Sequence, residues 1–281
     1  MIYLVLAVFS SMLVSVLMRA SEKQVKNNVS MLAMNYVMCT ALAFIFTGGI
    51  ELFPKAELPG LTIVLGVING LLYLGGFLLL QWNIKINGVV LPATFMKLGV
   101  LVPTVLAITV FGDKAEIWQI AGIALAVAAI LLIQLEKGGG KATPRLGLIV
   151  GLLCGGCADA MSKVFEYFGN PALGSHFLLY TFLCALIICI LLCIVKRQRL
   201  SAADTLFGLL IGVPNYFSSR FLLRSLSEVP AVIAYPTFSV GTIVLVTLAG
   251  AVIFREKLSK KQLIALAMIL AALVLLNLKF S

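Results

Sequence analysis

Long apolar segments, separated by short polar turns, run along the whole chain and limit the folds open to it. A helix needs about 20 apolar residues to cross a lipid bilayer. Such segments lie near residues 2–18, 30–50, 61–81, 88–111, 117–135, 146–165, 175–195, 205–223, 230–254 and 261–279. Only 11% of the 281 residues are charged, against roughly 25% in soluble domains, so lipid must surround most of the chain. The pattern predicts an all-α membrane protein with ten transmembrane helices.

The second half of the chain repeats features of the first half. An offset of 143 residues pairs Phe111-Gly112-Asp113-Lys114 with Phe254-Arg255-Glu256-Lys257, Thr94-Phe95 with Thr237-Phe238, and Tyr73 with Tyr216. An offset of 144 residues pairs Glu22 with Glu166 and Tyr36 with Tyr180 near the start of each half. We therefore expect a first five-helix repeat over 1–137, a linker over 138–145 and a second repeat over 146–281. Because five is an odd number, the two repeats enter the membrane in opposite directions, which favours a binding site between them near the bilayer midplane.

Basic residues concentrate on one side of the predicted membrane. The chain has 21 Lys and Arg against 11 Asp and Glu, and the loops after the odd-numbered spans hold the excess. By the positive-inside rule these loops are cytoplasmic and both termini lie outside. The excess charge therefore sets topology, and no basic motif interleaved with aromatic residues indicates a nucleic-acid partner. We expect a multi-pass protein of the bacterial inner (plasma) membrane.

The two repeated turns also carry a family resemblance. Phe111-Gly112-Asp113-Lys114 precedes a helix with Gln119-Ile120-Ala121-Gly122, and Phe254-Arg255-Glu256-Lys257 precedes a helix with Gln262. This arrangement resembles the EamA-like branch of the drug/metabolite transporter superfamily, although Asp113 stands where that family usually has Glu. The resemblance implies transport of amino acids, sugar phosphates, nucleotide sugars, nucleobases or drugs. Members of the family are generally described with both termini in the cytoplasm, so both orientations stay open.

Three charged residues fall inside predicted spans, where charge is costly and usually functional: Lys97, Asp159 and Arg220. Lys97 either binds an anionic group of the substrate or pairs with Asp159. Asp159 either forms an ion pair with Lys163, one turn further along the helix, or serves as a proton or cation site. Arg220 has Phe77 as its repeat partner, so packing symmetry does not require a charge there, and we take it as a substrate-binding residue.

Uncharged polar residues in the spans complete the predicted substrate-binding site. Side chains that supply hydrogen bonds or stacking surfaces are Thr94, Thr237, Tyr216, Asn215, Tyr235, Tyr73 and Asn35. The alternative is that they hold helices together. Pro214 and Pro236 interrupt two spans and serve either as hinges of moving gates or as static kinks.

These features predict a secondary active transporter of a small polar metabolite, anionic or zwitterionic, such as an amino acid or a related organic acid. It works by alternating access with a central site between the repeats; the alternative is an exporter of multiple drugs or aromatic compounds. The expected partners are the small-molecule substrate, the lipid bilayer, and a coupling proton or exchanged solute. We do not expect the chain to be an enzyme or to bind a cofactor or a metal ion. It has one histidine, His176, and its Cys154-Gly155-Gly156-Cys157 run lacks the second pair of ligands that a metal site would need. It also lacks a Walker motif for ATP.

Overall fold

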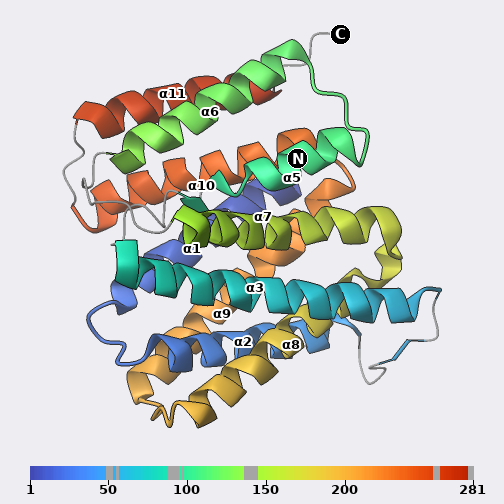
Figure 1. Ribbon diagram of the computed structural model, residues 1–281, viewed down its shortest axis with the longest axis vertical. Helices are drawn as coiled ribbons and strands as arrows, with labels where there is room; N and C mark the ends of the chain where they lie inside the picture. Colours follow the sequence, from blue (N-terminus) through green and yellow to red (C-terminus); the bar gives the residue numbers. More distant parts are fainter. Residues whose placement is uncertain are drawn as a thin grey trace. The chain divides into compact units, whose positions relative to one another are not determined.

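The computed structural model describes residues 1–48, 53–54, 57–87, 95–96, 98–135, 145–255 and 260–277. Over these residues the helices are α1 (Ile2–Ser21), α2 (Asn28–Phe46), α3 (Pro59–Asn87), α5 (Leu101–Thr109), α6 (Ile117–Leu135), α7 (Arg145–Phe168), the 3-10 helix η1 (Pro171–Leu173), α8 (Gly174–Val195), α9 (Ala202–Leu226), α10 (Ala231–Ile253) and α11 (Lys260–Asn277) (Figure 1). Seven of the helices in this described part are long and apolar enough to cross a membrane. The chain is thus an all-helical, multi-pass membrane protein, and the full count of ten spans and their inversion stay predictions.

The helices gather into two compact units. The first unit contains Met1–Leu74 and Val164–Ser227, and the second contains Gly75–Lys163 and Glu228–Ser281. Each unit therefore takes segments from both predicted repeats, 1–137 and 146–281. A compact unit need not coincide with a sequence repeat, so the predicted repeat boundaries stay a prediction. The predicted linker over 138–145 lies almost wholly outside the described residues.

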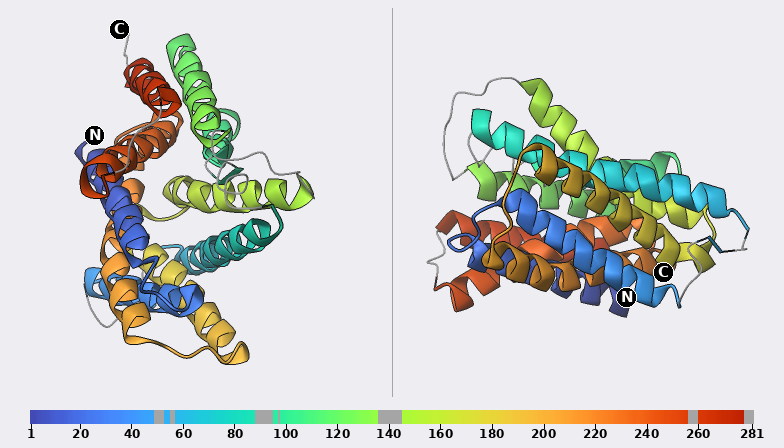
Figure 2. Two further views of the ribbon diagram at one scale, coloured as in Figure 1. Left: turned by 90° about the vertical axis from the view of Figure 1, so that its left-hand side faces the viewer. Right: turned by 90° about the horizontal axis from the view of Figure 1, so that it is seen from below.

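The first unit is organised around α9, which packs against α1 and α2, while α2 also packs against α8 (Figure 2). Two glycines one turn apart, Gly208 and Gly212, let the backbones of α9 and α2 approach closely. A methyl group added at Gly212 would lie 2.6 Å from the carbonyl oxygen of Asn35 and 2.5 Å from Cβ of Met38. Small residues spaced by four are the usual device for such approach between membrane helices, which lack a hydrophobic driving force between them.

The start of α9 is tied to the turn between α1 and α2 by one carboxylate. Ser201 and Asp204 form a capping box, in which the Ser201 side chain accepts from the Asp204 amide and Asp204 accepts from the Ser201 amide. The second oxygen of Asp204 accepts from the backbone amides of Lys26 at 2.9 Å and Asn27 at 3.3 Å. Asp204 is fully buried, and its bonds hold two chain segments at one end of the unit.

In the second unit, α6 and α11 lie side by side, and α10 packs against α5, α6 and α11 (Figures 1 and 2). Alanines of α6 and α11 meet branched residues of α10 and α11 in a core cluster formed by Ala126, Ala129, Val240, Val244, Ile269 and Ala272. Much of the remaining surface is apolar, as lipid-facing helices require.

We expect Gly212→Ala to lower the thermal unfolding midpoint in detergent, because the added methyl overpacks the contact between α9 and α2, at a cost of about 1–3 kcal/mol. The matched control is Gly60→Ala, since nothing lies within 4 Å of a methyl group added at Gly60. That change should leave stability equal or raise it by about 0.5–1 kcal/mol, because alanine is the better helix former. Equal midpoints for the two variants would contradict the close helix contact.

The orientation of the first unit is also measurable. Arg199 is an exposed residue at the basic end, after α8, whereas Ser227 is exposed at the other end, after α9. By the positive-inside rule, Ser227→Cys should react with a membrane-impermeant maleimide in intact cells and Arg199→Cys should react only after lysis. The wild-type protein measures the background from native cysteines. The reverse labelling pattern would place both termini in the cytoplasm.

Candidate functional site

Three helices hold the guanidinium group of Arg220 in the first unit. Its Nη1 donates to the hydroxyl of Tyr216, one turn earlier on α9, at 2.9 Å, and to Ser175 Oγ at the start of α8, at 3.0 Å. Its Cζ lies 4.3 Å from the ring centroid of Phe46 at the end of α2, a cation–π contact. These contacts offset the cost of placing a cation among apolar helices. Arg220 and Tyr216, both predicted site residues, are thus brought together.

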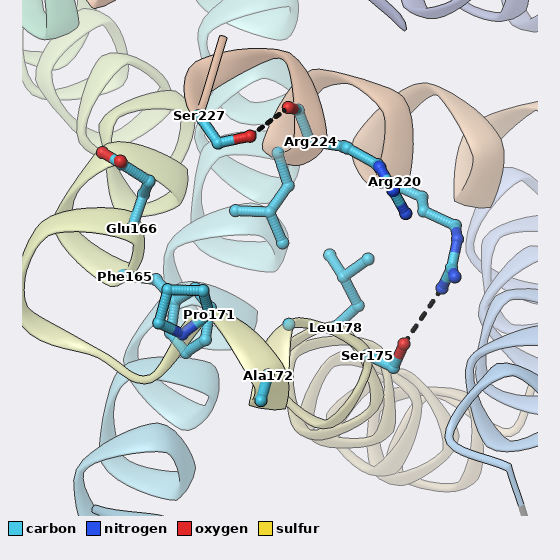
Figure 3. Close-up of a pocket in the computed structure, with 11 residues that line it drawn as sticks. Phe165, Glu166, Pro171, Ala172, Ser175, Leu178, Arg220, Arg224 and Ser227 are labelled. Carbon is cyan, nitrogen blue, oxygen red and sulfur yellow. Dashed lines mark hydrogen bonds between the residues drawn. The ribbon is translucent and has the colours of Figure 1, made fainter.

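Arg220 also lines a cavity of about 520 Å³ in the same unit (Figure 3). The volume falls in the range of roughly 300–1,000 Å³ that is typical of small-molecule sites. The cavity lies where α7 ends, where η1 leads into α8, and along the last turns of α9. Its apolar walls include Phe165, Leu178 and Leu223.

Charged and hydroxyl groups supply the polar lining of the cavity: Glu166, Ser175, Arg220, Arg224 and Ser227. Figure 3 shows the two arginines along α9 on one side and Glu166, from α7, on the other. Arg224 follows Arg220 by one turn, and its Cζ lies 4.9 Å from the ring centroid of Tyr3 in α1. The lining of the cavity therefore includes two cations and one carboxylate.

The sequence prediction did not include Glu166, Ser175 or Arg224 among the site residues. Glu166 and Arg224 lie near helix ends, where charged residues commonly face the membrane interface, and Ser175 follows a turn. The repeat aligns Glu166 with Glu22, but this alignment alone gave no reason to expect that Glu166 lies at a binding site. Only the fold brings these three residues to the same cavity as Arg220.

A run of aromatic rings extends from Arg220 into the unit. Phe46 stacks on Tyr216 with centroids 5.7 Å apart, and Tyr216 lies 6.2 Å from Phe182 of α8. Phe182 in turn makes an edge contact with Tyr73 of α3 at 6.4 Å. The rings of the predicted residues Tyr73 and Tyr216 therefore both contact the ring of Phe182, a residue that the sequence analysis did not select.

The predicted residues Asn35 and Asn215 bind each other. Asn215 Nδ2 donates to Asn35 Oδ1 at 3.2 Å and lies 3.6 Å from Cys39 Sγ. Asn35 is 2% exposed, and neither asparagine is among the residues that line the cavity. This pair connects α2 to α9, as the alternative interpretation expected of polar residues between membrane helices.

The second unit contains the other described candidates. Tyr235, at 2% exposure, donates its hydroxyl to the backbone carbonyl of Asp159 at 2.9 Å, which links α10 to α7. Thr237 is half-buried and follows Pro236, the proline inside α10. Lys97 and Thr94 lie outside the described residues, so the pairing of Lys97 with substrate or with Asp159 stays a prediction.

The repeated turn Phe111-Gly112-Asp113-Lys114 has a structural role in this unit. Gly112 has φ +71°, a left-handed conformation that glycine adopts readily, and it turns the chain after α5. Asp113 Oδ2 then accepts from the backbone amide of Val232 at 3.1 Å, in the first turn of α10. A carboxylate at this position satisfies an unpaired helix amide and complements the positive end of the helix dipole. Nearby, Lys163 is 9% exposed, with Nζ 5.9 Å from the ring centroid of Phe111.

We expect Asp113→Ala to lower the stability of the protein by about 1 kcal/mol, because it removes the cap of α10. Differential scanning fluorimetry in detergent measures the change. Asp113→Glu, which introduces the residue usual in the resembling family, should retain most of the stability, and Lys114→Ala, at an exposed neighbour, should have no effect. A midpoint for Asp113→Ala that equals the wild-type value would contradict the capping role.

Over the residues that the structure describes, there is no group of three or more His, Cys, Asp and Glu side chains that could hold a metal ion. The six cysteines are free thiols, of which Cys39 and Cys189 are buried.

Comparisons with known proteins agree with this architecture. Residues 145–278 match the EamA-like transporter family. A solved crystal structure of a protein superimposes with a TM-score of 0.78 at 13% identity and covers 98% of this chain and 96% of that one, which shows a common fold. An uncharacterized protein of Haemophilus influenzae is 22% identical over 288 residues, which cover 96% of this chain and 95% of the relative. The family match confirms the resemblance to the EamA-like branch over residues 145–278, which include the second of the two repeated turns.

Proposed function

Residues 145–278 match the EamA-like transporter family, and on this premise we propose that the chain is a secondary active transporter of a small polar metabolite that carries a negative charge. The substrate class is an amino acid or a related organic acid. One observation carries the proposal: the guanidinium of Arg220 lies half-buried at a cavity of about 520 Å³, fixed by Tyr216, Ser175 and Phe46.

Arg220 suits anion binding because of its geometry. A guanidinium presents five N–H donors in a planar fork that matches a carboxylate. Among the described residues, the hydrogen bonds of Arg220 use Nη1, so Nη2 and Nε remain available as donors to a ligand in the cavity. Because three helices already hold the side chain in place, little side-chain entropy is lost when a ligand binds.

Alternating access of the two inverted repeats, 1–137 and 146–281, is the proposed mechanism. α9 carries Arg220 and also contains Pro214, and α10 contains Pro236. A proline inside a membrane helix removes a backbone hydrogen bond and permits bending. Bending of α9 at Pro214 would move Arg220 relative to the start of the helix, and Asp159 is the proposed site for a coupling proton or cation.

The proposed location is the bacterial inner membrane. The apolar helices support insertion in a lipid bilayer, and the similar protein of Haemophilus influenzae supports a bacterial setting. The substrate is then exchanged between the cytoplasm and the cell envelope.

An exporter of aromatic or amphipathic compounds is the second candidate. The ring of Phe165, which lines the cavity and stacks on Phe177 with centroids 4.4 Å apart, favours it, because aromatic faces bind planar and cationic compounds. The two candidates differ in charge preference. Apolar cations should compete for the site of an exporter, whereas organic anions should compete if Arg220 binds the substrate.

We expect Arg220→Lys to reduce the affinity for the best-binding acid or amino acid by roughly tenfold or more, since a charge-assisted hydrogen bond contributes about 1.5–3 kcal/mol. Lysine keeps the positive charge but lacks the planar set of N–H donors of the guanidinium. Binding to the purified protein is screened by thermal stabilisation with a panel of organic acids and amino acids, and transport is then measured in proteoliposomes.

Arg199→Lys is the matched control, since Arg199 is exposed at the opposite end of the first unit. It should bind the same ligand with wild-type affinity. If Arg220→Lys binds that ligand as the wild type does, Arg220 is not the anion-binding group and the site assignment is wrong.

A further inference from the structure

A glycine lines the cavity directly beside a residue that holds Arg220. Gly174 is the first residue of α8, follows η1 and is half-buried. The next residue, Ser175, accepts a hydrogen bond from Nη1 of Arg220 at 3.0 Å. Because the Cα atoms of neighbouring residues lie about 3.8 Å apart, the backbone of Gly174 is close to the anchored guanidinium. The part of a ligand that adjoins a carboxylate bound at Arg220 would therefore lie near Gly174.

Other helix glycines of the first unit are explained by close helix packing. A methyl carbon added at Gly66 would lie 2.6 Å from Cβ of Tyr180, and one added at Gly70 would lie 2.5 Å from the carbonyl oxygen of Thr181. These two glycines let α3 approach α8 more closely than any side chain would permit. Glycine weakens a helix relative to alanine, so a helix glycine without such a contact needs another explanation.

Gly174 lacks that kind of contact within the described part of the chain. Outside its own helix turn, a methyl carbon added there would have two described atoms within 4 Å, Cδ2 of Leu223 at 3.5 Å and Cε1 of Phe165 at 3.9 Å. Both distances are ordinary van der Waals contacts, and both side chains line the cavity. The backbone of Gly174 has φ −56° and ψ −36°, a conformation open to every residue with a side chain. A side chain would thus fit the fold and fill part of the cavity.

We propose that Gly174 is a specificity-determining residue: its missing side chain leaves room, between Leu223 and Phe165, for a branched or aromatic group of the organic anion whose carboxylate binds Arg220. This inference rests on the proposed function and adds size selection to it. Phe165 is 1% exposed and stacks on Phe177 with centroids 4.4 Å apart, so one wall of this space is fixed in place. An apolar group that enters the space leaves water and contacts apolar side chains, which favours binding.

Two carboxylates of different bulk, propanoate and phenylacetate, test the inference. Their affinities for the purified full-length protein in nanodiscs are measured by isothermal titration calorimetry. The wild-type protein should bind phenylacetate about tenfold or more tightly than propanoate, because the ring buries more apolar surface. Gly174→Ala should lower the affinity for phenylacetate about threefold and Gly174→Val about tenfold or more, since the added methyl groups occupy the space of the ring. Both variants should bind propanoate with wild-type affinity.

The matched controls are Gly60→Ala and Gly60→Val. Gly60 also lies in the first turn of a membrane helix, α3, but it is exposed, is not among the residues that line the cavity, and has no described atom outside its own turn within 4 Å of an added methyl carbon. These two variants should bind both carboxylates with wild-type affinity.

A compensating variant separates size selection from a folding defect. Leu223 is the nearest neighbour of the added carbon, so Leu223→Ala in the Gly174→Val background enlarges the same space again. The double variant should recover most of the affinity for phenylacetate that Gly174→Val loses. A folding defect caused by Gly174→Val would not be repaired by a second truncation, because truncating an apolar side chain destabilises a protein further. If Gly174→Val does not fold, the affinities of Gly174→Ala decide the question.

The inference fails separately from the proposed function. Size selection by Gly174 is wrong if its variants leave the affinity ratio of phenylacetate to propanoate at the wild-type value, if the wild-type protein binds the two equally, or if the double variant recovers nothing. It is also wrong if neither carboxylate binds while another acid or an amino acid does, and in all these cases anion binding by Arg220 stands. If no acid or amino acid binds the wild-type protein, both the inference and the proposed function fail.

Discussion

A cation held among apolar helices is the constraint around which the first compact unit is arranged. The guanidinium of Arg220 needs partners because lipid offers none, and it finds them on three helices through Tyr216, Ser175 and Phe46. Those helices must therefore lie close together. The glycines of α9 permit this approach to α2, and the bond between Asn215 and Asn35 reinforces it. The close helix packing and the proposed ligand-binding residue Arg220 consequently lie on the same helix, α9.

The same logic explains why the polar groups of the cavity gather at one end of the unit. Helices in a bilayer place charged residues near their ends, where water and headgroups solvate them. The end of α7, the start of α8 and the end of α9 meet there, so Glu166, Ser175 and Arg224 join Arg220. The exposed Arg224 and the half-buried Arg220 therefore line the same cavity one helical turn apart.

Much of the helical pattern was predictable, while the composition of the site was only partly so. The apolar segments predicted α9 and α10 because a 20-residue apolar run has few alternatives to a membrane helix. Arg220 was selected because a charge within a span stands out, and it lines the cavity. Tyr216 was selected for its hydroxyl, which accepts from Arg220, although Tyr216 is not among the residues that line the cavity. Asn35 was also selected, yet its amide binds Asn215 instead of lining the cavity. Polar residues that hold helices together and those that bind ligands look alike in a sequence, since both interrupt an apolar segment.

The sequence by itself determined that the chain is a helical membrane protein, and its repeated turns indicated the family, because hydropathy and short local motifs are properties of neighbouring residues. The tertiary structure decided which charges share a cavity. Glu166 and Arg220 are 54 residues apart, and nothing in the local pattern of either one specifies the other. Their meeting depends on how α7, α8 and α9 pack, which is set by side-chain volumes and glycine contacts along whole helices.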